Sequence, residues 1–162
     1  MSADTGLDPA HNRALAALDA SGIPYEARRH EPVRSLEEAA RVRGVTSGEI
    51  VKSMVVRLAE GEYAIVLVPG DRKISWPKLR QALGVNRATM PSADEALEAT
   101  GFERGTITPF GLRHPLPVLA DTAVPDGAIS MGGGAHDVAV YLEGSALKSH
   151  FDARVLDLTD PA

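Results

Sequence analysis

Glycine and proline are concentrated in residues 101–111, which read GFERGTITPFG. Glycines at positions such as Gly101 and Gly105 can adopt backbone conformations that other residues avoid, and they allow a ligand to approach the main chain. Pro109 stiffens the chain and removes one backbone donor. A loop of this composition can line a pocket with peptide N–H and C=O groups. The same composition also suits a plain tight turn between a helix and a strand.

A second segment with few side chains is Gly132-Gly133-Gly134, which lies between Ser130 and His136. Consecutive N–H groups in such a bend can form a concavity that binds an anion. That anion could be a phosphate, a carboxylate or the oxyanion of an ester-hydrolysis transition state. A loose hairpin tip fits the same residues equally well. The pattern is neither GxGxxG after a first strand nor a Walker loop.

Lys52 stands near the start of an apolar run, with Val51 before it and Ser53 and Met54 after it. One possibility is that its stem packs along the strand and its ammonium reaches water. The other is that the ammonium faces a pocket and holds a phosphate or carboxylate as a point charge. A role as general base would require burial to lower its pKa from about 10.4.

Several common catalytic signatures are missing from the chain. It has no cysteine, and its five histidines lack metal-ligand spacing. No GxSxG motif marks a serine nucleophile. We therefore expect neither a metal nor an organic cofactor.

The composition predicts a cytoplasmic protein of one domain. The chain has 162 residues, 44% of them hydrophobic, and it shows neither a signal-peptide pattern nor an apolar run long enough to span a membrane. We expect residues 1–8 to be a disordered lead and residues 9–162 to form the domain.

The net charge is −5, which argues against indiscriminate binding to nucleic acid. Positive charge is nevertheless concentrated in residues 1–87, which contain 13 Lys or Arg against 11 Asp or Glu. These form two loose basic groups, at positions 28–43 and 72–87. Each group is either a solvated face or, if the two converge, a surface that can hold a few phosphates.

The spacing of apolar residues predicts a single α+β domain, in which helices surround a mixed, barrel-like sheet. Residues 51–58 and 63–68 are expected to form a hairpin whose second strand is buried on both faces. A turn is predicted at 69–73. Helices are expected at 9–20, 35–43, 75–84, 93–99 and 144–149, and further strands at 23–28, 116–120, 127–131, 137–142 and 153–158.

Together these segments resemble the YbaK/ProX family of aminoacyl-tRNA editing domains, a fold that is also inserted in bacterial prolyl-tRNA synthetases. Residues 101–111 resemble the family's G-x-x-x-G-x-x-x-P-[FL]-G loop, and Lys52 followed by Ser53 resembles its lysine-plus-hydroxyl pattern. The resemblance extends from about Arg13 to Leu158.

The resemblance implies hydrolysis of the ester that joins a wrong amino acid to tRNA, with a mischarged tRNA for proline as the expected type of substrate. Lys52 is expected to be the residue most needed for activity, and a ribose hydroxyl of the substrate to assist the attack of water. The expected partner is the tRNA acceptor end, with an aminoacyl-tRNA synthetase as the second candidate. Expected substrate-binding residues are Tyr25, His30, Ser53, Gly101, Gly105, Thr106, Pro109, Phe110, Gly111, Ser130, Gly132, Gly133, Gly134 and His136.

Members that remove cysteine often carry a Gly-Lys-Arg-Gly turn where this chain has Gly132-Gly133-Gly134 before His136. The missing positive charges argue against a cysteine substrate. Two alternatives stay open: a module that binds tRNA or a synthetase without turnover, and an enzyme that acts on small amino-acid derivatives.

Overall fold

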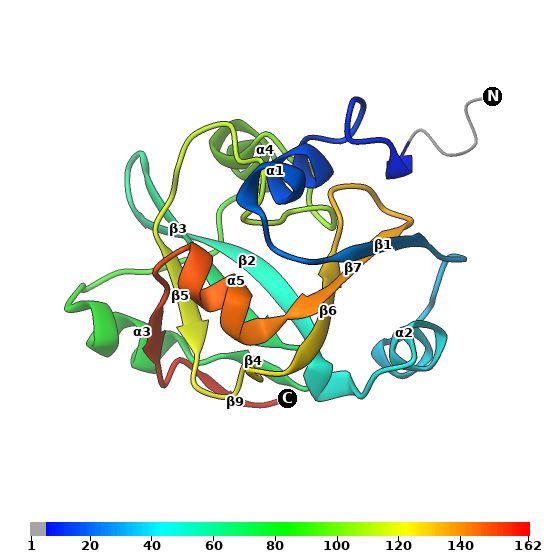
Figure 1. Cartoon of the computed structure of the whole chain (residues 1–162). Helices are drawn as coiled ribbons and strands as arrows, with labels where there is room; N and C mark the ends of the chain where they lie inside the picture. Colours follow the sequence, from blue (N-terminus) through cyan, green and yellow to red (C-terminus); the bar gives the residue numbers. More distant parts are fainter. Residues whose placement is uncertain (1–5) are drawn as a thin grey trace.

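The computed structural model describes residues 6–162 of the chain (Figure 1). The predicted lead at 1–8 therefore lies mostly outside the described residues, and in its remainder the carbonyl of Gly6 accepts a hydrogen bond from Asn12. The helices are α1 (Arg13–Ser21), α2 (Leu36–Arg43), the 3-10 helix η2 (Ser47–Glu49), α3 (Trp76–Leu83), α4 (Ala93–Thr100) and α5 (Gly144–His150). The strands are β1 (Glu26–Arg29), β2 (Ile50–Ala59), β3 (Glu62–Pro69), β4 (Arg72–Ile74), β5 (Val118–Asp121), β6 (Ala128–Gly132), β7 (Val138–Glu143), β8 (Arg154–Leu156) and β9 (Thr159–Pro161).

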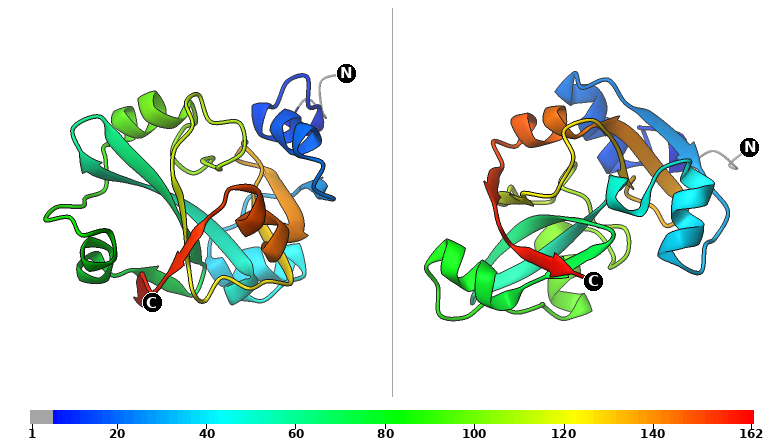
Figure 2. Two further views of the ribbon diagram at one scale, coloured as in Figure 1. Left: turned by 60° about the vertical axis from the view of Figure 1, so that its left-hand side comes forward. Right: turned by 90° about the horizontal axis from the view of Figure 1, so that it is seen from below.

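Seven of these strands form one mixed sheet in the order β1-β7-β6-β2-β3-β5-β8. Strand β2 is parallel to β6, and β5 is parallel to both β3 and β8, whereas the other neighbours are antiparallel. Strands β4 and β9 form a separate antiparallel pair. The views agree that α2 and α3 lie on opposite sides of the molecule (Figures 1 and 2). The predicted α+β class is confirmed.

The predicted hairpin is the β2–β3 pair, which turns at Glu60-Gly61. Gly61 has φ +73°, a conformation that glycine adopts without strain. Residues 64–69 of β3 are all buried. The prediction that this strand is covered on both faces is therefore confirmed.

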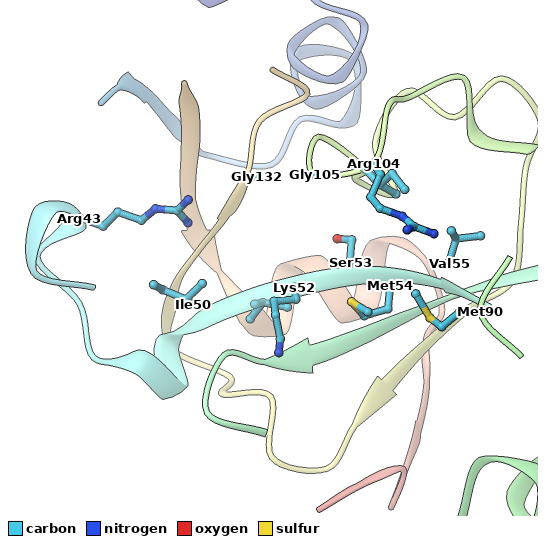
Figure 3. Close-up of a pocket in the computed structure, with 12 residues that line it drawn as sticks. Arg43, Ile50, Lys52, Ser53, Met54, Val55, Met90, Arg104, Gly105 and Gly132 are labelled. Atoms are coloured by element: carbon cyan, nitrogen blue, oxygen red, sulfur yellow. The ribbon is translucent and has the colours of Figure 1, made fainter. Parts of the chain in front are cut away.

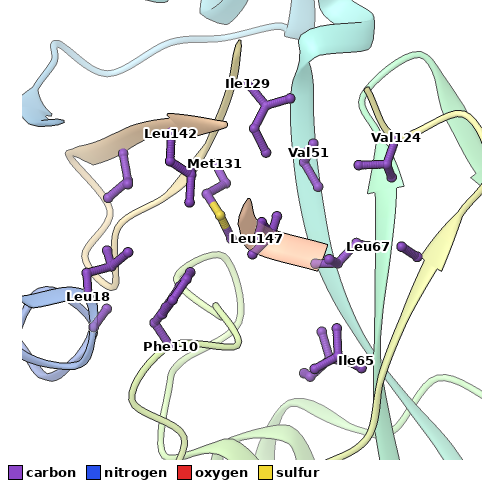
Figure 4. Close-up of a cluster of buried hydrophobic side chains, with 14 of the residues drawn as sticks. Leu18, Val51, Ile65, Leu67, Phe110, Val124, Ile129, Met131, Leu142 and Leu147 are labelled. Atoms are coloured by element: carbon purple, nitrogen blue, oxygen red, sulfur yellow. The ribbon is translucent and has the colours of Figure 1, made fainter. Parts of the chain in front are cut away.

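Most buried side chains form a large cluster on one face of the sheet and a smaller one on the other, and a third small cluster packs Ala39 and Ala40 of α2 against Ile50. The larger cluster joins Leu18 of α1, Leu147 of α5 and Phe110 to the sheet (Figure 4). The smaller cluster packs Leu79 of α3 against Val66 of β3. Alternate residues of β2 therefore face two different cores.

The predicted boundaries differ from the observed ones most clearly at three places. Helix α1 begins at Arg13 rather than at 9, because the Asn12 side chain accepts hydrogen bonds from the N–H groups of Ala14 and Leu15 and caps the helix there. The predicted turn at 69–73 contains the start of β4, which pairs with β9 at the end of the chain. The predicted last strand at 153–158 is shorter, and the chain continues into β9.

Candidate functional site

A gap in the sheet lies along the outer edge of β2. Strand β6 pairs with β2 at Ile50 and Val51 and then diverges, while farther along the same edge Arg57 exchanges two backbone hydrogen bonds with Thr89. Backbone groups of alternate residues point to the same edge of a strand. The N–H and C=O groups of Ser53 and Val55 therefore face this gap.

A cavity of about 390 Å³ occupies the gap (Figure 3). Its wall combines the edge of β2 with Gly105 of the 101–111 loop and Gly132 of the glycine turn. The structure thus brings Lys52 and both predicted bends to one cavity. The lining residues are Arg43, Ile50, Val51, Lys52, Ser53, Met54, Val55, Met90, Arg104, Gly105, Ile107 and Gly132.

Lys52 lies at this cavity, but its ammonium is turned to the face of β2 opposite Ser53 (Figure 3). Its Nζ donates a hydrogen bond of 3.0 Å to the carbonyl of Arg72. Burial lowers the pKa of Lys52 below its ordinary value, and the nearby Asp71 carboxylate partly offsets this. An ammonium has three donors, so this one bond leaves donors for a ligand.

Ser53 and Arg43 present unpaired polar atoms at the cavity. The Oγ of Ser53 and the Nε of Arg43 are buried, and neither has a hydrogen-bond partner among residues 6–162. The Nη1 of Arg43 lies 3.3 Å from the Oγ of Ser130 and donates to it. Burial lowers the pKa of Arg43. Buried polar groups are normally paired, so these atoms are available to hydrogen-bond a ligand or water in the cavity.

The charges at the cavity all have one sign. Arg43, Lys52 and Arg104 line it, and its lining within the described chain contains no carboxylate. Arg104 is held in place by a hydrogen bond of 2.8 Å to the carbonyl of Pro91. A wall of cations, one hydroxyl and apolar side chains suits an anionic ligand with an apolar part.

The 101–111 loop is anchored to α1 by one side chain, that of Arg13. Its Nε donates to the carbonyl of Gly111 at 2.8 Å and its Nη2 to that of Gly101 at 3.0 Å. The guanidinium also lies over the ring of Phe102, 4.6 Å from its centre. Both ends of the loop are therefore fastened to one residue, which positions Gly105 at the cavity.

The two glycine-containing bends meet at His136. Its Nε2 lies 3.6 Å from a carboxylate oxygen of Glu103. A Cβ on Gly105 would lie 3.4 Å from the Cε1 of His136. His136 is exposed and lies beside the cavity rather than in its lining.

Within the glycine turn, Gly132 lines the cavity and the other two glycines serve packing. The N–H of Gly133 donates to the carbonyl of Val138, so it is not available to an anion. A Cβ on Gly134 would lie 2.8 Å from the side chains of both Asn12 and Ala14. A Cβ on Gly133 would lie 2.6 Å from the side chain of Val138, so this glycine is needed for packing against β7 and Gly134 for packing against the start of α1.

Other residues expected at the site lie away from the cavity lining. The hydroxyl of Tyr25 donates to Asp19 at 2.6 Å, and burial together with this bond raises the pKa of Tyr25 to about 12. The Nδ1 of His30 lies 3.0 Å from the carbonyl of Glu31. The remaining five shape the protein around the site: Gly101 and Gly111 at the Arg13 anchor, and Thr106, Pro109 and Phe110 as buried loop residues.

Only Lys52, Ser53, Gly105 and Gly132 of the lining were singled out from the sequence as site residues, and the lining residues that were missed include Arg43, Met90 and Arg104. Arg43 belonged to the first basic group, and it is the member of that group that lines the cavity. Arg29 of the same group pairs with Asp137 instead, and Lys78 of the second group pairs with Asp157 and Asp160. These members of the two groups therefore form ion pairs of their own outside the cavity lining.

The described residues contain no cluster of three or more His, Asp or Glu side chains able to hold a metal ion. Nor do they include a helix with the length and apolarity to cross a bilayer.

Comparison with known proteins places this cavity in a family context. A family model described as an aminoacyl-tRNA editing domain matches residues 30–149, which include all twelve lining residues. A candidate trans-editing enzyme for prolyl tRNA synthetase has a similar crystal structure, with a TM-score of 0.84 and 26% identity over 91% of this chain and 95% of that one.

Among curated proteins, the proline–tRNA ligase of Bacillus licheniformis is 34% identical over 96 residues, which is 59% of this chain and 17% of the ligase. The uncharacterized protein YwhH of Bacillus subtilis is 42% identical over 91 residues, or 56% of this chain and 57% of YwhH. The chain thus matches a small part of the ligase and somewhat more than half of YwhH.

Proposed function

Because the chain belongs to the aminoacyl-tRNA editing domain family, we propose that it hydrolyses the ester bond of a mischarged aminoacyl-tRNA. The similarity to proline–tRNA ligases makes a tRNA for proline the first substrate to test. The proposed partners are the acceptor end of that tRNA and, for delivery, the synthetase that charges it. The proposed place of action is the cytoplasm, where charged tRNA is used.

The observation that carries this proposal is the make-up of the cavity. Arg43 and Arg104 supply positive charge for the RNA end, Lys52 adds a charge from the other face of β2, and Val55 and Ile107 supply an apolar wall for an amino-acid side chain. Ser53, whose Oγ is unpaired, lines the same cavity. An aminoacyl ester on a terminal ribose has the matching combination of negative, polar and apolar groups.

The cavity offers no activated protein nucleophile. Its lining contains neither a histidine nor a carboxylate within residues 6–162 that could take the proton of Ser53. We therefore assign the attack to water. The water oxygen bonds to the carbonyl carbon of the ester, and the bond from that carbon to the ribose oxygen breaks. The ribose oxygen takes a proton from the attacking water. The free hydroxyl of the same ribose orients the water, and Ser53 with the N–H groups at the β2 edge stabilises the oxyanion.

Selection of the amino acid would follow from size, because the wall beside Ser53 is mostly apolar. One methylene in an apolar pocket is worth about 1–3 kcal/mol, so a size filter separates neighbours by about 10- to 200-fold. The amino acid that belongs on the tRNA would be excluded by its shape rather than by a specific hydrogen bond.

A panel of mischarged tRNAs tests the function directly. We expect the purified protein to deacylate at least one of Cys-, Ala- and Ser-tRNA specific for proline, and to spare the correctly charged tRNA. Binding of tRNA without turnover of any member would instead identify a non-catalytic module. Equal turnover of free amino-acid esters with and without tRNA would indicate a small-molecule hydrolase.

Ser53→Ala should separate activity from stability. We expect the deacylation rate to fall about tenfold, because the hydroxyl that faces the ester is lost. The protein should be equally stable or up to about 1 kcal/mol more stable, because a buried hydroxyl without a partner is costly. Urea unfolding and single-turnover deacylation measure the two effects, and Ser53→Thr, which keeps the hydroxyl, is the matched control. A variant that loses stability but keeps its rate would remove Ser53 from the mechanism.

A further inference from the structure

A second cavity, of about 300 Å³, adjoins the first. The two share three lining residues, Lys52, Met54 and Met90. The second cavity lies on the face of β2 toward which Lys52 points, since Lys52 is paired with Val68 of β3 and both line it. Residues directly opposite each other in neighbouring strands present their side chains to the same face. The strand edge therefore separates two compartments that meet at Lys52.

The distinctive side chain of the second cavity is Trp76. It is the only tryptophan of the chain and the first residue of α3, which Ser75 caps. Trp76 is partly buried, packs against the smaller core cluster, and lines the cavity together with Ile74. An aromatic side chain that is fixed in this way and still reaches a cavity can serve as a platform for a flat ligand.

Positive charge accompanies this aromatic surface. Lys73 is exposed and lines the cavity, and Lys52 forms part of the wall shared with the first cavity. No carboxylate belongs to the lining of the second cavity within the described chain. Aromatic side chains with nearby cations are typical of proteins that bind single-stranded nucleic acid, where bases stack and phosphates pair with lysine.

We propose that the second cavity binds the terminal adenine of the tRNA, stacked on Trp76, while Lys52 and Lys73 contact the phosphate on the 5′ side of that nucleoside. This inference rests on the proposed function, which puts the aminoacyl ester and its ribose in the first cavity. The base is bonded directly to that ribose, so it must enter a space next to the ester. The second cavity meets the first at Lys52, which would then hold the nucleotide where ribose and phosphate join.

The test uses ligands that cannot be cleaved. One is 3′-amino-3′-deoxyadenosine that carries alanine through an amide, and the other is the same compound without the base. We expect the adenosine compound to bind wild type about tenfold more tightly than the base-free compound, and to quench the fluorescence of Trp76. Isothermal titration calorimetry gives the affinities of variants that lack tryptophan.

The decisive comparison tests whether the preference for the adenine-containing compound depends on the aromatic ring of residue Trp76. In Trp76→Leu, which keeps an apolar side chain against the core, the tenfold preference for the adenosine compound should disappear. In Trp76→Phe, which keeps an aromatic ring, most of it should return. Thermal unfolding checks that each variant is folded. A 5′-phosphate on the adenosine compound should increase its affinity about fivefold. Lys73→Ala should lose this increase. Arg154→Ala, a change on the distant edge strand β8, should retain it.

Three results would overturn the inference. One is an unchanged preference for the base in Trp76→Leu. Another is absence of binding by either compound to the wild type. The third is a Trp76 effect that follows the amino acid rather than the base, which would make the second cavity the amino-acid pocket. Because these measurements need no turnover, a protein that stacks adenine but cleaves no mischarged tRNA would contradict the proposed function and leave the adenine site standing.

Discussion

Replacing Lys52 by alanine should lower the single-turnover deacylation rate about 100-fold or more and leave the fold intact. Lys52 is the cation shared by both cavities, and removing one charged or hydrogen-bonding group from a pre-organised site commonly costs about 10²–10³ in rate. In the folded protein its Nζ donates a hydrogen bond to the carbonyl of Arg72. The loss of that bond should cost only about 1 kcal/mol of stability.

The matched control is Lys148→Ala. Lys148, like Lys52, is partly buried and donates to a backbone carbonyl, that of Val124 at 3.0 Å, but it lies outside both cavities. It should lose comparable or greater stability, since it also pairs with Asp126, and keep the wild-type rate. If Lys52→Ala retained a rate within threefold of wild type on every substrate of the panel, the proposed role of Lys52 would be abandoned.

The pKa of Lys52 adds a pH dependence to this prediction. Burial lowers that pKa, so the ammonium loses its proton at a lower pH than an exposed lysine would. Binding of an uncleavable RNA end should therefore weaken as the pH rises toward the ordinary lysine value of about 10.4. The stability effect has the opposite sign: because the folded state holds this proton less tightly than the unfolded state, the Lys52 contribution to stability rises with pH over the same window. The alanine variant should lack both effects.

The part of the site that lies on regular sequence patterns could be predicted. The β2–β3 hairpin follows from two apolar runs around Glu60-Gly61, and it places Lys52 near the start of β2. The glycine spacing of residues 101–111 identified the loop. In both places local propensity and the final structure agree.

What could not be predicted depends on contacts between distant segments. Arg43 ends α2 and looks like a solvated helix terminus, and only the pairing of β2 with β6 brings Ser130 next to its guanidinium. The Arg13 anchor joins α1 to carbonyls that lie 88 and 98 residues farther along the chain. The turn predicted at 69–73 becomes the start of β4 because the chain end supplies β9 as a partner. Such pairings carry no local signal in the sequence.

Gly111 illustrates how a residue expected to contact substrate can act through packing instead. It has φ +79°, and a Cβ at this position would lie 2.7 Å from the carbonyl oxygen and 2.8 Å from the carbonyl carbon of Arg13. Both are backbone atoms of α1, so they cannot move aside as the end of a flexible side chain can. A side chain at 111 would have to push the loop away from the helix.

We therefore expect Gly111→Ala to destabilise the protein by about 3 kcal/mol or more, because a left-handed conformation alone costs a non-glycine residue about 1–2 kcal/mol and the backbone clash adds to it. Gly22→Ala isolates the first contribution, since Gly22 has φ +76° and nothing within 4 Å of its would-be Cβ. Urea unfolding of both variants measures the difference. The Gly111 variant should also lose activity, even where it remains folded, because displacement of the loop by about 1 Å at Gly105 would misplace the cavity wall. Equal destabilisation of the two variants would show that the loop adjusts freely, and the Arg13 anchor would then be unnecessary for positioning the site.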